Sequence, residues 1–141
     1  MPTNTVFRAV IDTNVVFEGL TKQGGLAGVI IEAWLANLFQ AYASNALAYE
    51  YADVLSRKLS QRRWHQLQPV LGTLLKNVRF AEIHYLWRPT SPDPADDHII
   101  DCAMNANAII VTSNLRDFQK AKEMLRVTVM SPLEFVIELA K

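Results

Sequence analysis

The sequence has little of several features that would each indicate a class of protein. Its 141 residues include a single cysteine, Cys102, so no disulfide can form within the chain, which fits a reducing cytoplasm. Its 14 basic residues balance its 14 acidic ones, so net charge alone does not indicate a nucleic-acid partner. Apolar runs fall short of the roughly 20 residues that span a bilayer, and residues 1–12 lack the pattern of a secretion signal. We therefore expect a cytoplasmic protein with no membrane partner, built as one domain over residues 1–141.

The chain instead alternates short β-branched segments with longer segments of helical periodicity. Strands are predicted at residues 6–11, 39–44, 79–85, 108–112 and 127–130. Helices are predicted at residues 26–38, 46–59, 68–78, from about 94 onward, and 132–140. This alternation favours an α/β domain, a three-layer α/β/α sandwich around a parallel sheet of about four or five strands. In such folds, ligands bind beyond the carboxyl ends of the strands.

Several carboxylates fall at that edge of the predicted sheet. Asp12 directly follows the first strand, while Glu50 and Asp96 lie in the first turns of helices that follow other strands. Three converging carboxylates would repel one another and would bind either protons or a cation. Mg2+ takes oxygen ligands, and a pair of such ions can activate water and stabilise the leaving oxygen of a phosphodiester. The pattern therefore indicates metal-dependent phosphodiester hydrolysis.

Each of these acids also has an ordinary structural interpretation. An aspartate after a strand, such as Asp12, is commonly a helix cap or a turn residue. Asp96 and Asp97 together suit the first turn of a helix, where carboxylates complement the helix dipole. Glu50 on its own is an ordinary helical glutamate. Spacing alone therefore leaves both interpretations open.

Four longer motifs, taken together, favour the catalytic interpretation. They are VIDTNVV at residues 10–16, SNALAYEYADVL at 44–55, DPADDHIIDCAM at 93–104 and IIVTSNLRDF at 109–118. In this order they resemble the PIN-domain family of ribonucleases over almost the whole chain, in particular the VapC-like toxins of bacterial toxin-antitoxin pairs. The resemblance implies a PIN-like fold and an endoribonuclease that uses Mg2+ or Mn2+ to cut RNA. It also implies a homodimer and a small antitoxin protein as partner.

The resemblance further implies a set of metal-binding residues. Asp12, Glu50 and Asp96 would hold a first cation, and Asp117 with Asn114 would complete the fourth corner of the site. Many relatives carry an aspartate at the position of Asn114. An amide oxygen can still bind a metal or orient a water molecule, but it brings no charge. A second cation would then bind weakly, or Asp117 would supply the missing charge.

The third acid is chosen by its distance along the chain. Thr112 follows Asp96 by sixteen residues and Asp97 by fifteen, and the usual spacing in the family is close to the first. Asp96 is therefore the predicted ligand and Asp97 the alternative. Asp101, on the same predicted helix, would either support the site as an outer carboxylate or face solvent.

Other polar residues near the motifs have smaller predicted roles. Thr13, Asn14 and Thr112 carry side chains that can hydrogen-bond Asp12 or a water on the metal, although all three also suit turns and caps. The phosphates of a substrate attract cations. The predicted substrate contacts are Arg116, Arg57, Arg62 and Arg63. For each of these arginines, a solvated helix face is the alternative.

Two further classes of function share part of this pattern. A PIN fold that has lost its chemistry would serve as a binding or assembly module, and Asn114 is the residue that suggests it. A phosphotransfer enzyme would use Asp12 as its nucleophile, as receiver domains and haloacid-dehalogenase-type phosphatases do. Those phosphatases need an aspartate where this chain has Asn14, and a receiver needs an acidic pair after its first strand. The phosphotransfer class is therefore disfavoured.

Overall fold

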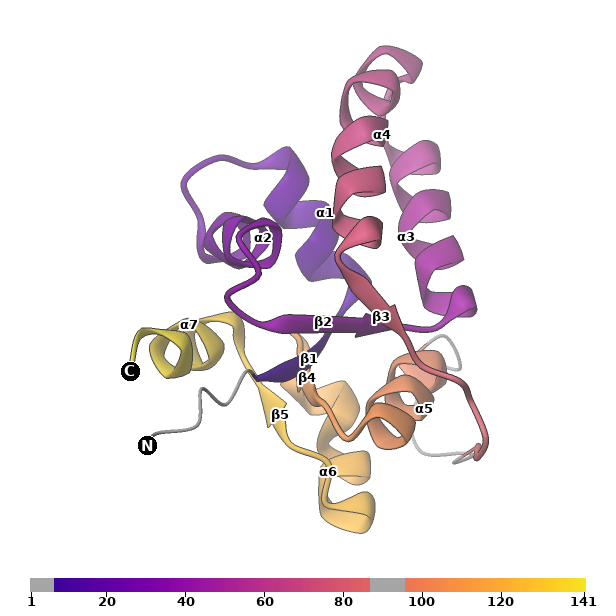
Figure 1. Ribbon diagram of the computed structural model, residues 1–141, viewed down its shortest axis with the longest axis vertical. Coiled ribbons are helices and arrows are strands. Elements are labelled where there is room, and N and C mark those ends of the chain that lie inside the picture. Colours follow the sequence, from indigo (N-terminus) through magenta and orange to yellow (C-terminus); the bar gives the residue numbers. More distant parts are fainter. Residues whose placement is uncertain (1–6, 87–95) are drawn as a thin grey trace.

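A computed structural model describes residues 7–86 and 96–141, and within these ranges the chain forms an α/β domain (Figure 1). The strands are β1 (Arg8–Ile11), β2 (Gln40–Ala43), β3 (Val78–Phe80), β4 (Ile109–Val111) and β5 (Val129–Met130). The helices are α1 (Thr13–Thr21), α2 (Leu26–Leu35), α3 (Asn45–Lys58), α4 (Gln61–Lys76), α5 (Asp96–Ala106), α6 (Gln119–Leu125) and α7 (Pro132–Ala140), with a 3-10 turn η1 (Leu115–Phe118). No helix in the described ranges is both long enough and apolar enough to cross a bilayer.

The described strands form a parallel sheet in the order β3-β2-β1-β4-β5. The chain crosses the sheet in one direction from β1 to β3 and in the opposite direction from β3 back to β5. Because crossovers between parallel strands are almost always right-handed, the two directions send the connecting helices to opposite faces. Helices α1 to α4 cover one face, and α5 and α6 cover the other (Figure 1). α7 packs on α2. The sheet with helices on both faces confirms the predicted three-layer sandwich.

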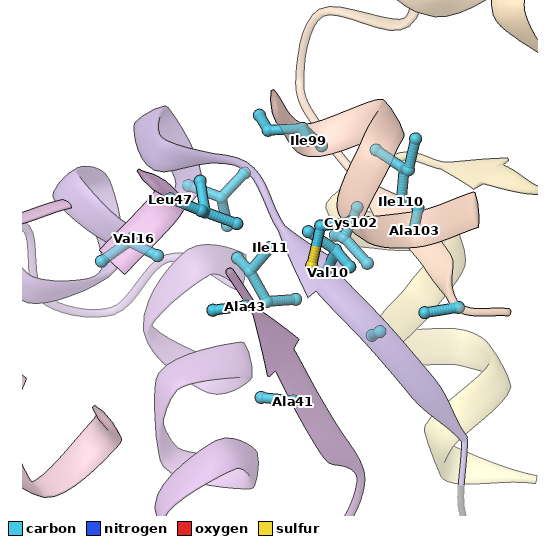
Figure 2. Close-up of a cluster of buried hydrophobic side chains, with 14 of the residues drawn as sticks. Val10, Ile11, Val16, Ala41, Ala43, Leu47, Ile99, Cys102, Ala103 and Ile110 are labelled. Carbon is cyan, nitrogen blue, oxygen red and sulfur yellow. The ribbon is translucent and has the colours of Figure 1, made fainter. Parts of the chain in front are cut away.

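β1 lies in the middle of the sheet and is buried on both faces. Its residues Ala9, Val10 and Ile11 are fully buried. Successive side chains of a strand point to opposite faces, so Val10 lies toward Cys102 of α5 while Ile11 lies toward Leu47 of α3 (Figure 2). A continuous apolar run of this kind is typical of a parallel strand that is covered on both sides. The packing of this strand therefore fixes the position of the next residue, Asp12.

Helices α1 and α6 are not predicted by the sequence pattern. The apolar residues of α1 continue the apolar run of β1, so no change of periodicity separates the two elements. In the structure Val15 and Val16 are buried, and α1 packs against α2 and α3. α6 has seven residues and buries only Ala121, so its apolar pattern is weak. Tertiary packing, rather than local periodicity, selects these helices.

The start of α4 and the end of β3 also differ from the prediction. α4 starts before the expected segment because Ser60 caps its first turn with a side-chain hydrogen bond, and Pro69 lies inside the helix rather than near its start. β3 ends at Phe80, although a strand is predicted to continue to residue 85. Ala81 still donates to the Ala43 carbonyl of β2 (2.8 Å), and farther on the backbone of His84 and Tyr85 bonds to the side chain of Asn105 on α5.

Gly19 allows α1 and α2 to approach closely. A Cβ atom at this position would lie 2.5 Å from Cγ1 of Ile31 and 2.7 Å from the carbonyl oxygen of Ala27. Because a backbone atom cannot move aside easily, we expect Gly19→Ala to lower the free energy of unfolding by about 1–3 kcal/mol, measured by urea denaturation.

Gly72 in α4 provides the matched control for this substitution. A Cβ atom there would meet nothing within 4 Å. Gly72→Ala should therefore raise the free energy of unfolding by about 0.5–1 kcal/mol, because alanine loses less backbone entropy in a helix than glycine does. Equal effects of the two substitutions would contradict the close contact between α1 and α2.

Candidate active site at the carboxyl edge of the sheet

The carboxyl ends of β1 and β4 meet in the middle of the sheet. The two strands pair in parallel register, with Ile11 opposite Val111, so the residues that follow them, Asp12 and Thr112, are neighbours. The chain leaves β1 through α1 and leaves β4 through η1 and α6, which lie on opposite faces (Figure 1). The crevice where connections diverge in this way is the usual ligand site of an open α/β sheet.

Asp12 is held tightly in this crevice. It is 4% exposed, its N–H donates to the Val111 carbonyl (2.9 Å), and its Oδ2 accepts a hydrogen bond from Oγ1 of Thr112 (2.7 Å). Asp12 occupies the N-cap position of α1, yet its carboxylate makes no capping hydrogen bond. The amides of Asn14 and Thr13 therefore act on it mainly as nearby dipoles.

The pKa of Asp12 is raised above its ordinary value. Burial raises it most, while the hydrogen bond from Thr112 and the amides of Asn14 and Thr13 lower it in part. The negative charge of Asp117 then raises the pKa further. The protein groups around Asp12 thus replace only part of the water that the carboxylate loses on folding.

The hydroxyl of Thr112 links Asp12 to the turn after β4. Thr112 is fully buried, and its Oγ1 accepts a hydrogen bond from the Asn114 N–H (3.0 Å) while it donates to Asp12. Asn114 itself is exposed. This arrangement joins Thr112 to Asp12 and places Asn114 at the same edge.

Two contacts bring Glu50 of α3 toward the end of β1. Oγ1 of Thr13 donates to Oε2 of Glu50 (2.9 Å). The hydroxyl of the fully buried Tyr51 donates to the Ile11 carbonyl. The pKa of Tyr51 is raised well above its ordinary value, by burial first and then by the charges of Cys102, Asp12 and Glu50.

The acids of α5 differ in burial. Asp97 is 4% exposed and Asp101 is 2% exposed, whereas Asp96 is half-buried. Asp97 and Asp101 are four residues apart and therefore share one face of the helix. α5 packs on β1, β2 and β4 and also contacts α3. Asp101 does not face solvent, which excludes one of the two roles predicted for it.

The remaining predicted groups divide between two regions. Asp117 in η1 is half-buried and close enough to Asp12 to raise its pKa, and Arg116 beside it is exposed. Arg57, Arg62 and Arg63 lie instead at the junction of α3 and α4, away from the sheet (Figure 1).

Two of these arginines, Arg57 and Arg63, also bind neighbouring protein groups. Arg57 pairs with Asp53 at 2.9 Å, and Arg63 donates to the Thr21 carbonyl at 3.4 Å. Because α3 begins at the sheet edge and a helix rises about 1.5 Å per residue, Arg57 lies roughly 10 Å beyond Glu50 along the helix axis.

Comparison with known protein families agrees with this geometry. A family model described as PIN domain matches residues 8–116. The chain belongs to the PIN-domain family. The predicted resemblance is thus confirmed over most of the length of the chain. No curated protein sequence matches this PIN domain significantly.

Several solved structures share the fold of this PIN domain. VapBC2 from Rickettsia felis, solved with a DNA fragment from its promoter, contains a chain that is 17% identical, with a TM-score of 0.65 over 89% of this chain and 98% of that one. FitAcB from Neisseria gonorrhoeae is 16% identical, with a TM-score of 0.61 over 89% and 98%. PAE2754 from Pyrobaculum aerophilum is 12% identical, with a TM-score of 0.60 over 99% of each chain. At these identities the likeness shows the fold.

The donor atoms at the edge of this PIN domain suit a hard cation. Asp12, Glu50 and Asp117 offer carboxylate oxygens, and burial leaves Asp12 short of compensating charge. Within residues 7–86 and 96–141, no three His, Cys, Asp or Glu side chains lie close enough together to enclose a metal ion. Mg2+ is commonly held by one or two carboxylates with water and substrate oxygens as its other ligands, so the donor set fits this ion.

Sequence reasoning overlooked the hydrogen bond of Tyr51 and left the burial of Asp101 open. Tyr51 follows Glu50 directly and reads as one apolar residue of a helix, and its hydrogen bond to β1 has no signal in the sequence. The burial of Asp101 has no such signal either. Asp101 is two residues from both Ile99 and Ala103, and residues two apart do not share a face of a helix, so the helical phase places it away from these apolar side chains.

Burial of Asp12 should make the stability of the metal-free protein depend on pH. Folding raises the pKa of Asp12 above its unfolded value of 3.8. The contribution of Asp12 to the free energy of unfolding is therefore fully present below pH 3.8 and is lost as pH rises through the folded pKa. In Asp12→Asn the amide keeps an acceptor for Thr112 and does not titrate. We expect this variant to be more stable than wild type at pH 7 in EDTA, with a difference that shrinks as pH falls. Thermal unfolding across this pH range tests it, and a difference independent of pH would contradict it.

Proposed function

We propose that this PIN domain is a Mg2+- or Mn2+-dependent endoribonuclease, the toxin of a toxin-antitoxin pair. The observation that carries the proposal is the buried Asp12 carboxylate, hydrogen-bonded by Thr112 at the point where β1 and β4 diverge. Membership of the PIN-domain family supports a nuclease. The buried charge of Asp12, which the protein compensates only in part, supports a bound cation.

Asp12, Glu50 and Asp97 are the candidate ligands, of which one or two would contact the cation directly while the others would bind its water molecules. We favour Asp97 over Asp96 because the side chain of Asp97 is buried, whereas that of Asp96 is half-buried. Asp117 and the amide oxygen of Asn114 would bind on the η1 side. The bound cation would supply activation of a water molecule and stabilisation of charge on the phosphate under attack.

The surrounding residues have positioning roles in this proposal. Thr112 fixes the orientation of the Asp12 carboxylate, and Thr13 does the same for Glu50. Arg116, exposed beside Asp117, is the cation best placed to meet a substrate phosphate. Arg57, Arg62 and Arg63 would contact only parts of an RNA that extend well beyond the cut.

The structural neighbours and the family resemblance support the choice of partners. VapBC2 and FitAB were each solved with a DNA fragment, and each structure contains a chain with this fold. We therefore propose a small antitoxin protein and a second copy of this chain as partners, in the cytoplasm. A short upstream reading frame that encodes a DNA-binding protein would support the antitoxin.

Cleavage of RNA is the direct test of the activity. We expect the wild-type protein with Mn2+ to cut RNA to products with a 5′-phosphate, and Asp12→Asn to lose more than about 100-fold of the rate, because loss of even an indirect metal partner commonly costs 10- to 100-fold. Gel analysis of end-labelled RNA measures both quantities.

Asp53→Asn is the matched control for this assay, since Asp53 lies on α3 in an exposed ion pair with Arg57. It should cleave at the wild-type rate. Cleavage that survives Asp12→Asn would overturn the proposed mechanism. Absence of cleavage by the wild-type protein on any RNA would favour the alternative, a PIN fold that serves as a binding or assembly module.

Thermal shifts distinguish the two candidates for the third acid. A ligand at 100 times its Kd stabilises a protein by about 2.7 kcal/mol, so saturating Mn2+ should raise the Tm of the wild-type protein by several degrees. Asp97→Asn should remove most of this rise, and Asp96→Asn should retain it. The reverse result would restore Asp96 as the metal ligand.

A further inference from the structure

A cleft with a volume of about 600 Å³ lies beside the candidate acids. The carboxyl ends of β2 and β3, the start of α3 and one face of α5 form its walls, through residues that include Asn45, Ala46, Phe80 and Asp101. This volume falls within the range of small-molecule binding sites.

The cleft adjoins the candidate acids at the carboxyl edge of the sheet on two sides. Ala46 of α3 lies one helical turn before Glu50, and Asp101 of α5 lies one turn after Asp97. One turn of an α-helix spans about 5.4 Å, so a group in the cleft would be roughly one nucleotide away from a phosphate at the acids. The position is therefore suited to a part of the substrate next to the cut.

Hydrogen bonds to one side chain define the outer wall. Oδ1 of Asn105 on α5 accepts from the N–H groups of His84 (3.0 Å) and Tyr85 (3.3 Å). Its Nδ2 donates to the carbonyl oxygens of Tyr85 (3.0 Å) and Asp101 (2.7 Å). These hydrogen bonds attach the segment after β3 to α5. The outer wall of the cleft is therefore held in place by α5.

The lining of the cleft suits a flat ring with hydrogen-bond donors. Phe80 is 50% exposed and Ile83 is 37% exposed, so both present apolar surface to the cleft. The charged side chains among the described lining residues are the carboxylates of Glu82 and Asp101, with His98 beside them and neither Lys nor Arg. Carboxylates reject phosphate but accept hydrogen bonds from the amino group of a base.

We propose that this cleft binds a nucleobase of the RNA next to the scissile phosphate, stacked on Phe80, with preference for a base that carries an amino group. The inference rests on the proposed function, because the neighbouring acids are the reason to expect RNA there. Aromatic side chains commonly stack on single-stranded bases without regard to sequence. The carboxylates add discrimination, and cytosine is therefore preferred to uracil, which has a carbonyl oxygen in place of the amino group.

The test measures binding of two labelled RNA octamers, rC8 and rU8, by fluorescence anisotropy in EDTA, which prevents cleavage. The wild-type protein should bind rC8 more tightly than rU8. Phe80→Ala should weaken binding of rC8 by about 5- to 100-fold, the usual effect of removing one stacking side chain. Phe80→Tyr should keep the affinity, because a tyrosine ring stacks equally well.

Ile137→Ala is the matched control, since Ile137 on α7 is 49% exposed and does not line the cleft. It should bind both octamers as the wild-type protein does. Equal affinity of the wild-type protein for rC8 and rU8, or equal affinity of Phe80→Ala and Ile137→Ala for rC8, would overturn the proposal. Unchanged Tm of Phe80→Ala would show that its loss of binding is not a loss of folding.

The cleavage assay separates failure of this inference from failure of the proposed function. If the wild-type protein cuts RNA with Mn2+ while Phe80→Ala keeps both its affinity for rC8 and its profile of cut sites, the base site is wrong and the nuclease stands. If no RNA is cut and binding of rC8 still depends on Phe80, the nuclease is wrong and the base site stands.

Discussion

The burial of one carboxylate constrains much of this structure. Asp12 follows a strand that is buried on both faces, so its charge loses water on folding and has to be compensated by neighbouring groups. Thr112 supplies a hydrogen bond, and the first amides of α1 supply partial positive charge. The raised pKa of Asp12 means that these groups leave a deficit, which a divalent cation at the same place would remove.

The parallel sheet decides which groups share the edge with Asp12. All strands end on the same side, so the helices that follow them start there and carry the residues of their first turns to that edge. α3 brings Glu50 from one face of the sheet, and α5 brings Asp97 and Asp101 from the other. The same geometry takes the arginines at the end of α3 away, because a helix that starts at the edge leads its later residues outward.

The carboxyl edge of the sheet has two regions with different side chains. Around Asp12 the groups suit a metal ion and a phosphate, with Arg116 on the η1 side. In the cleft near Phe80, the exposed apolar surface and the carboxylates suit a ring rather than a phosphate. The proposed nuclease would use the first surface for the bond that is cut and the second for the neighbouring base.

Most of the architecture could be predicted from the sequence. The strands of a parallel sheet are short and apolar throughout, and the residue that ends such a strand falls at a known edge, so Asp12 and Thr112 are recognisable without a structure. The motifs around them were sufficient for the family. Helix α1 was not predictable in this way, because its apolar residues follow those of β1 without a polar break.

The preference for Asp97 among the acids of α5 rests on the tertiary structure alone. Counting residues back from Thr112 favours Asp96, but the exposed fraction of each side chain depends on how the helix is rotated against the sheet, and that rotation buries Asp97 and Asp101. The bond from Tyr51 to β1 and the attachment of residues 84 and 85 to Asn105 are likewise contacts between distant segments. The sequence by itself determined the order of the elements and the acids available at the edge, because both follow from local periodicity. Which acids turn inward, and what lies beside them, depended on packing between elements that are far apart in the chain.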